Sequence, residues 1–268
     1  MQQLLESEAS KRPLISASLP LSSLREEYER GAGHFVRQID WLAAQGYTHV
    51  RRTRGDGDCF YRSLAFAWLA RLMSAPDKDV AVSLALSLLE ASLDVLRAAG
   101  FQPLVFEDFY DVLAALVRAV AVADPSSGTP LTPATLLQAF QDPETSNCIV
   151  VFLRMLTSAV IRTDADSYAP FLVHPDTGAD IVPHEFCERF VEATGKEADH
   201  IQISALTKAL RTPVRVAYLD GHAPDSVNFV DFVHHDIDDG GEAQDQVRET
   251  VLLYRPGHYD ILEKQATG

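Results

Sequence analysis

The sequence predicts an α+β fold in which a small mixed or antiparallel sheet is flanked by many helices. Two observations lead to this fold class. Apolar residues recur with helical spacing through most of the chain before residue 211, whereas alternating, strand-like segments concentrate in its last third. Helices that come first and strands that come last are typical of α+β domains. A core of adequate size is expected, because 47% of the 268 residues are hydrophobic and 23% are charged.

Helical patterns account for most of the chain up to residue 211. Residues 25–45 predict one or two helices, since Phe35, Ile39 and Leu42 would share one stripe. The segment after Cys59 is the next helix. A loop rich in proline and serine at residues 124–130 separates two later ones. The remaining helical patterns lie at residues 79–99, 107–123, 133–140, 144–161, 183–193 and 201–211.

Three strands are predicted near the C-terminus, at residues 214–219, 250–255 and 258–262. The 30 residues from 220 to 249 between the first two form an unusually long connection, because structureless loops rarely exceed about 15 residues. We expect either a flap that contacts substrate or a flexible segment. Its acidic residues and histidines lack the ligand spacing of a calcium loop, so we expect no metal site there. These residues are His222, His234, His235, Asp236, Asp238 and Asp239.

Charge and composition exclude several classes of partner. The chain carries 38 acidic and 23 basic residues, a net charge of −15. Sequence-independent nucleic-acid binding is therefore disfavoured, because it requires clustered lysine and arginine. No uninterrupted apolar run reaches the ~18 residues that span a membrane, and the N-terminus lacks the pattern of a secretory signal. We expect a cytoplasmic protein, with the nucleus as a second location, and no membrane partner.

Three cysteines, at positions 59, 148 and 187, have no close spacing. Their odd number and their separation argue against a disulfide framework and against a cysteine-rich zinc site. Cys148 and Cys187 lie in apolar helical segments and are predicted to be buried packing residues. Cys59 differs, because it follows a glycine-containing turn and begins a helical pattern. The unpaired N–H groups and the dipole at a helix start favour a thiolate, which makes Cys59 a candidate nucleophile.

A base for this thiol is predicted 199 residues later (258 − 59). Side chains two apart on a strand share a face, so His258 and Asp260 would stand together while Tyr259 and Ile261 point into apolar packing. A carboxylate placed in this way holds an imidazole in one tautomer while its other nitrogen faces the thiol.

Each of these residues also has a structural alternative. Cys59 could be a packing residue of an amphipathic helix, and His258 a polar residue of an edge strand. His200 is a second candidate base, but Asp199 before it reads as a helix N-cap. We favour His258, because Asp260 orients it and the Pro256-Gly257 turn can present it.

The two motifs, Gly-Asp-Gly-Asp-Cys-Phe-Tyr-Arg at residues 55–62 and Arg-Pro-Gly-His-Tyr-Asp at 255–260, resemble those of the ovarian-tumour-type cysteine proteases. Within that group the chain is similar to the otubains, which are deubiquitinating enzymes. The resemblance extends over roughly residues 13–264, which we take as a single catalytic domain between a flexible N-terminus (1–12) and a short tail (265–268). Further segments that carry it lie at residues 13–16, 24–28, 150–158, 185–187 and 199–206.

The resemblance implies a papain-like fold, Cys59 as nucleophile, His258 as general base and acid, and Asp260 as the orienting carboxylate. It also implies an oxyanion hole built from the backbone N–H groups of Asp56, Gly57, Asp58 and Cys59. One departure concerns Asp58, where the family usually has asparagine. A carboxylate that points toward the thiol would oppose thiolate formation, whereas one that faces solvent would matter little.

The function implied is hydrolysis of isopeptide bonds between ubiquitin and lysine, without a metal or organic cofactor. Ubiquitin or polyubiquitin is the expected partner. A non-catalytic regulator that binds ubiquitin and ubiquitin-conjugating enzymes is the main alternative, and a pathogen-type effector acting on a ubiquitin-like modifier is a third. Linkage preference and oligomeric state have no signature in the sequence.

Overall fold

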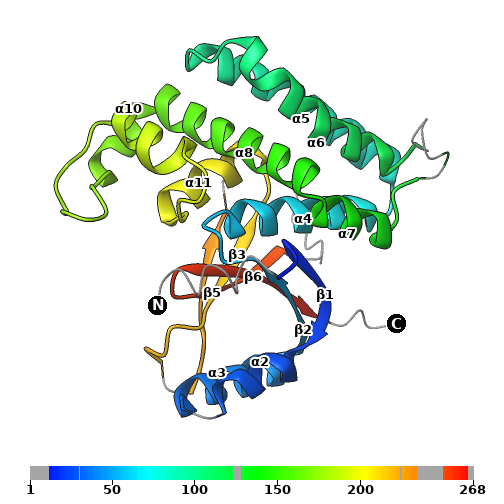
Figure 1. The fold of residues 1–268 in the computed structure, drawn as a ribbon, viewed down its shortest axis with the longest axis vertical. Coiled ribbons are helices and arrows are strands. Elements are labelled where there is room, and N and C mark those ends of the chain that lie inside the picture. Colours follow the sequence, from blue (N-terminus) through cyan, green and yellow to red (C-terminus); the bar gives the residue numbers. More distant parts are fainter. Residues whose placement is uncertain are drawn as a thin grey trace, which may run out of the picture.

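The computed structural model describes residues 12–29, 31–122, 128, 130–223, 225–233 and 250–264. Within these residues a six-stranded sheet lies between two helical layers of unequal size (Figure 1). The expected fold class is confirmed. Predictions for residues 1–11, for the stretch 234–249 with its two histidines and acidic residues, and for the tail 265–268 lie outside the described residues.

The sheet has the strand order β1-β2-β6-β5-β3-β4. Its described pairings are antiparallel apart from β3 with β5, which makes the sheet mixed. The strands are β1 (Ile15–Pro20), β2 (Tyr47–Thr53), β3 (Val214–Tyr218), β4 (Asn228–Phe232), β5 (Thr250–Arg255) and β6 (His258–Lys264).

Strands β1, β2 and β4 were not predicted, and the expectation that strands follow helices is wrong for the first two. β1 and β4 are the edge strands, and each buries only one residue fully. β2 buries every third residue rather than every second. These strands therefore lack the alternation by which a strand is recognised in sequence.

Alternation along the central strands divides the core between the two faces of the sheet. Leu252 of β5 and Ile261 of β6 pack into a large cluster with the upper helices. Val251 and Leu253 point to the opposite face, into a smaller cluster. Two helices cover that second face, α2 (Leu21–Tyr28) and α3 (Gly33–Ala44). The predicted helical region at residues 25–45 is thus two helices.

The larger helical layer is centred on α8 (Pro143–Thr163), which contacts α4, α5, α6, α7 and α11. In the described part of the chain α8 is the one helix long and apolar enough to cross a membrane, yet 67% of that window is buried inside the protein. The other helices of this layer are α4 (Cys59–Met73), α5 (Lys78–Ala98), α6 (Pro103–Ala119), α7 (Pro133–Gln141), α9 (Ala165–Tyr168), η1 (Ala169–Phe171), α10 (Pro183–Phe186), the π-helix η2 (Cys187–Glu192) and α11 (His200–Ala209).

Two predictions about this layer need correction. α6 begins four residues before the expected Glu107, because Pro103 occupies the first turn, where its missing N–H costs no hydrogen bond. Cys148 is half-buried on α8 rather than buried, whereas Cys187 is buried as expected.

Candidate active site

Cys59 is the first residue of α4, and the chain reaches it through the turn that follows β2. Its side chain is buried, with 2% of its surface exposed. The backbone N–H of Tyr259 on β6 donates to Sγ over 3.4 Å. The helix start and this N–H both favour negative charge on the sulfur. The predicted place of Cys59 at a helix N-terminus is confirmed.

His258 and Asp260 lie side by side at the start of β6, and Tyr259 points into the large core cluster, as predicted. The turn before β6 uses Gly257, whose φ of +72° favours glycine. Nε2 of His258 lies 2.8 Å from Oδ1 of Asp260. Nδ1 is buried and makes no hydrogen bond of normal length within the described residues, so this nitrogen is available to the thiol and to a substrate.

Asp260 is fully buried and has further donors. The Thr53 N–H donates to Oδ1 over 3.0 Å, and Nη2 of Arg255 donates to Oδ2 over 2.5 Å. Burial alone would raise the pKa of Asp260, but the hydrogen bond from His258 and the charges of Arg255 and His258 lower it to about 2. The carboxylate therefore stays charged and fixed.

Burial likewise opposes a charged His258, but other interactions outweigh it. The hydrogen bond to Asp260, together with the negative charges of Asp260 and Cys59, raises the pKa of His258 to about 9. An imidazolium beside a thiolate is the resting state that cysteine proteases use.

The turn before Cys59 holds the predicted oxyanion-hole donors. Two of the four N–H groups already donate within the chain, Asp56 to the carbonyl of Arg54 and Asp58 to Oδ1 of Asp56, each over 3.0 Å. The N–H groups of Gly57 and Cys59 make no hydrogen bond within the described residues. They are therefore the two donors that an oxyanion could use.

The Asp58 side chain takes neither of the two directions considered from sequence. Oδ1 accepts from Nε and Nη2 of Arg154, over 2.9 and 2.6 Å, and from the N–H of Gly195 over 3.1 Å. The carboxylate is thus paired with a buried cation. Its charge is largely neutralised, which removes the objection to thiolate formation.

Arg154 ties this turn to the loop at residues 193–199. Besides Asp58, its guanidinium donates to the carbonyls of Gly57, Val191 and Lys196, over 3.0, 2.8 and 2.6 Å. It also stacks on the ring of Tyr61, with 4.3 Å from Cζ to the ring centroid. Gly57 lies so close to the backbone of Gly195 that an added Cβ would come within 2.2 Å of the Gly195 carbonyl oxygen.

Sequence reasoning missed Arg154 as a site residue, although a charge within the apolar stretch 150–158 was the available signal. It also missed Arg255 as a partner of Asp260. His200 does not join the site. It follows the N-cap Asp199, as expected, and its ring packs against Tyr218 and Phe232.

Comparisons with known proteins agree with this geometry. The family model described as Peptidase C65 Otubain matches residues 7–264. The "OVARIAN TUMOR DOMAIN-containing deubiquitinating enzyme 1" of Arabidopsis thaliana is 36% identical over 96% of this chain and 83% of its own length. "Ubiquitin thioesterase OTUB1" of Homo sapiens is 34% identical over 96% of this chain and 85% of its own. The corresponding values for human "Ubiquitin thioesterase OTUB2" are 34%, 90% and 91%.

Solved structures of the same group share the fold. The structure of h/ceOTUB1 with ubiquitin aldehyde and UBC13~Ub superimposes with a TM-score of 0.81 at 28% identity, over 98% of this chain and 96% of that one. A second structure, which contains UBCH5B~Ub, gives a TM-score of 0.80 at 26% identity, over 98% and 95% of the two chains.

Proposed function

This chain belongs to the peptidase C65 otubain family, and we propose that it is a deubiquitinating cysteine protease that hydrolyses isopeptide bonds between ubiquitin and lysine. One observation carries the proposal: Cys59 at the start of α4 lies beside the His258–Asp260 pair of β6. The substrate class is supported by the relatives, which are named ubiquitin thioesterases and a deubiquitinating enzyme.

In the first half of the proposed reaction, the Cys59 thiolate attacks the carbonyl carbon of the C-terminal glycine of ubiquitin. A C–S bond forms, and the N–H groups of Gly57 and Cys59 stabilise the negative oxygen. The imidazolium of His258 then gives its proton to the lysine nitrogen, the C–N bond breaks, and the lysine leaves as an amine.

In the second half, neutral His258 takes a proton from a water molecule, whose oxygen attacks the thioester. The C–S bond breaks, the thiolate and imidazolium return, and the C-terminal carboxylic acid of ubiquitin releases its proton to solvent and leaves as a carboxylate. Asp260 holds the ring and stabilises its positive charge in both halves. This proposed sequence needs no metal or organic cofactor. We also propose a cytoplasmic location, because a reducing compartment keeps Cys59 as a free thiol.

Binding of ubiquitin-conjugating enzymes is a second candidate function. The observation that favours it is the presence of UBC13~Ub and UBCH5B~Ub in two of the similar structures. The two candidates differ in whether Cys59 reacts, which a single assay decides.

The test uses ubiquitin with a thiol-reactive group at its C-terminus, incubated with the wild-type protein and with Cys59→Ala. We expect a covalent adduct with the wild type and none with Cys59→Ala. Cys148→Ala is the matched control, because Cys148 is the half-buried cysteine of α8, and it should form the adduct. If folded wild-type protein binds ubiquitin without forming an adduct, the protease proposal fails and the binding function remains.

A further inference from the structure

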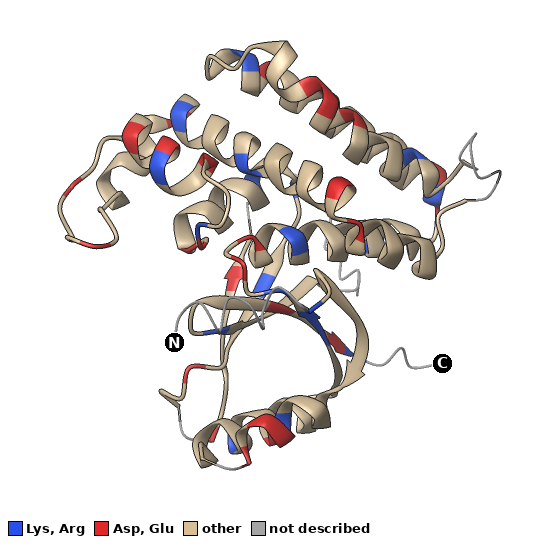
Figure 2. Ribbon diagram, viewed as in Figure 1, with Lys and Arg blue, Asp and Glu red and all other residues tan. Residues whose placement is uncertain are grey.

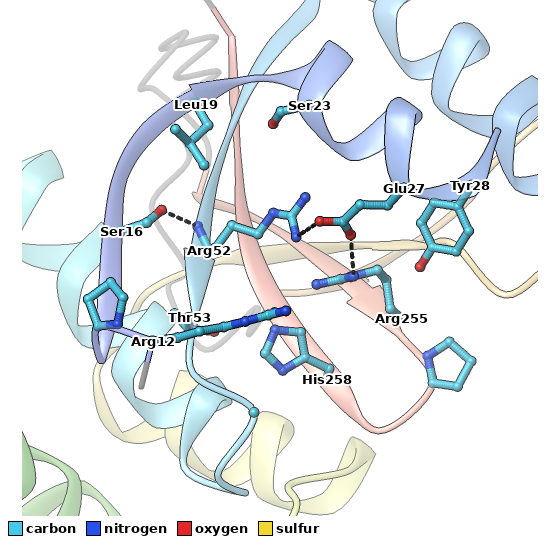
Figure 3. A pocket seen from close by; sticks show the side chains of 13 residues that line it. Arg12, Ser16, Leu19, Ser23, Glu27, Tyr28, Arg52, Thr53, Arg255 and His258 are labelled. Atoms are coloured by element: carbon cyan, nitrogen blue, oxygen red, sulfur yellow. Dashed lines mark hydrogen bonds and ion pairs between the residues drawn. The ribbon is translucent and has the colours of Figure 1, made fainter. Parts of the chain in front are cut away.

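A cavity of about 560 Å³ opens beside His258, between α2 and the end of the sheet at which β2 and β6 meet (Figure 3). Its wall contains Arg12, Arg52, Arg255 and His258, against one carboxylate, Glu27. In a protein with a net charge of −15 this is a local concentration of positive charge. Strand β2 carries two adjacent arginines, Arg51 and Arg52, and Figure 2 shows acidic as well as basic residues on both helical layers.

The two inner arginines share Glu27 and have donors to spare. Nη1 of Arg52 lies 2.6 Å from Oε1 of Glu27, and Nη1 of Arg255 lies 3.8 Å from Oε2. Figure 3 shows the Glu27 carboxylate between the two guanidinium groups. Nε of Arg52 and Nε of Arg255 are buried and have no hydrogen-bond partner in the described part of the chain. The protein shields these two atoms, so a ligand in the cavity would meet the Nη groups of the guanidiniums rather than Nε.

The position of the cavity indicates which part of a substrate reaches it. His258 must come within hydrogen-bond distance of the lysine nitrogen to which it gives its proton. The two substituents of a trans amide run in opposite directions from the bond. The turn at residues 56–58 packs against Gly195, and neither this turn nor the loop at 193–199 lines the cavity. The chain that carries the lysine therefore runs past His258 toward the cavity.

Building on the proposed function, we propose that this cavity binds an acidic side chain next to the lysine of the leaving chain. Arg52 and Arg255 are specificity-determining residues in this proposal, and a carboxylate from the substrate accepts hydrogen bonds from their guanidinium Nη groups. Glu27 is about half exposed and competes with that carboxylate for the same two arginines. Preference for acidic over basic surroundings of the lysine follows from the charge of the wall.

The test measures kcat/KM for three conjugates, each with ubiquitin joined by an isopeptide bond to the single lysine of a short peptide. The residues that flank the lysine are acidic, neutral or basic. We expect the acidic conjugate to be cleaved about fivefold faster than the neutral one, and the neutral one faster than the basic one, as partly exposed ion pairs allow. Equal values overturn the inference and leave the protease intact. Absence of cleavage of all three overturns the proposed function itself.

Variants separate recognition from a loss of folding. Arg52→Gln should reduce the ratio of acidic to neutral cleavage toward one, whereas Arg97→Gln, the same change on the distant helix α5, should keep it near five. Glu27→Gln should increase the ratio, because it removes the competing carboxylate. A merely structural role would lower all three values together, and a ratio that stays constant in both Arg52→Gln and Glu27→Gln overturns the inference.

Discussion

The two sides of the proposed active site hold their arginines in opposite ways. On one side Arg154 is buried and makes five hydrogen bonds, to Asp58 and to three backbone carbonyls. On the other side Arg52 and Arg255 line an open cavity, share the half-exposed Glu27 and keep unpartnered Nε atoms, although Arg255 also donates to Asp260. An arginine whose side-chain donors are paired with backbone carbonyls and a carboxylate holds the surrounding backbone in place. A cation with spare donors is suited to recognise something that arrives.

The largest expected difference between the two sides is in stability. Arg154→Met would leave Asp58 without its cation and three carbonyls without their donor, and should lower the free energy of unfolding by about 3–5 kcal/mol. Arg52→Met removes a partly exposed ion pair and should cost about 1 kcal/mol or less. Urea unfolding of both variants measures the difference. Equal losses would contradict the distinction between a fixing and a recognising arginine.

Between the two sides stands His258, and its charge is the next test. Asp260→Asn removes the carboxylate that helps to raise the pKa of His258 to about 9. We expect kcat/KM for a ubiquitin substrate to fall about 100-fold, within the range that a positioned acid–base group contributes.

The pH profile distinguishes this effect from misfolding. In the wild type kcat/KM should fall as pH rises through about 9, because His258 then loses the proton that it gives to the lysine. In Asp260→Asn the fall should occur at lower pH. The same raised pKa contributes stability that is complete below about pH 6.5 and is lost as pH rises through about 9. Glu263→Gln on the same strand is the control, and a shifted profile there would refute the assignment.

The sequence predicted the reacting groups because their signals are local. Cys59 is placed by a turn and the helix after it, and His258 and Asp260 are two apart on one strand. The structure confirms these placements, while the catalytic roles remain predictions. The Asp58–Arg154 pair joins residues 96 apart in sequence, and no periodicity links them. The cavity draws its wall from β1, α2, β2, β5 and β6, of which β1 and β2 had no strand pattern. The cavity could therefore not be predicted from the sequence, because two of the strands that form its wall could not be predicted.

Substitutions of Asp58 separate the effect of its negative charge from the effect of its hydrogen bonds to Arg154 and Gly195. Asp58→Asn keeps an Oδ1 acceptor for Arg154 and Gly195, so kcat/KM should stay within about threefold of the wild type. Asp58→Ala removes the acceptor, and a tenfold or greater loss is expected from a turn that is no longer held. If Asp58→Asn and Asp58→Ala lower kcat/KM equally, the charge of Asp58 rather than its hydrogen bonds positions the turn.

The smallest expected effect concerns the cavity beside His258. Salt should weaken its preference for acidic residues near the lysine, but it should not weaken the buried Asp58–Arg154 pair. The charges of the cavity wall are partly exposed, and raising the ionic strength from about 0.05 to 0.5 M shortens the Debye length from about 14 to 4 Å. The ratio of kcat/KM for the acidic conjugate to kcat/KM for the neutral conjugate should then fall by about half. The unfolding difference between wild type and Arg154→Met should hardly change over the same range, because that pair is shielded from solvent ions. A salt-independent preference would mean that shape, not charge, selects the leaving chain.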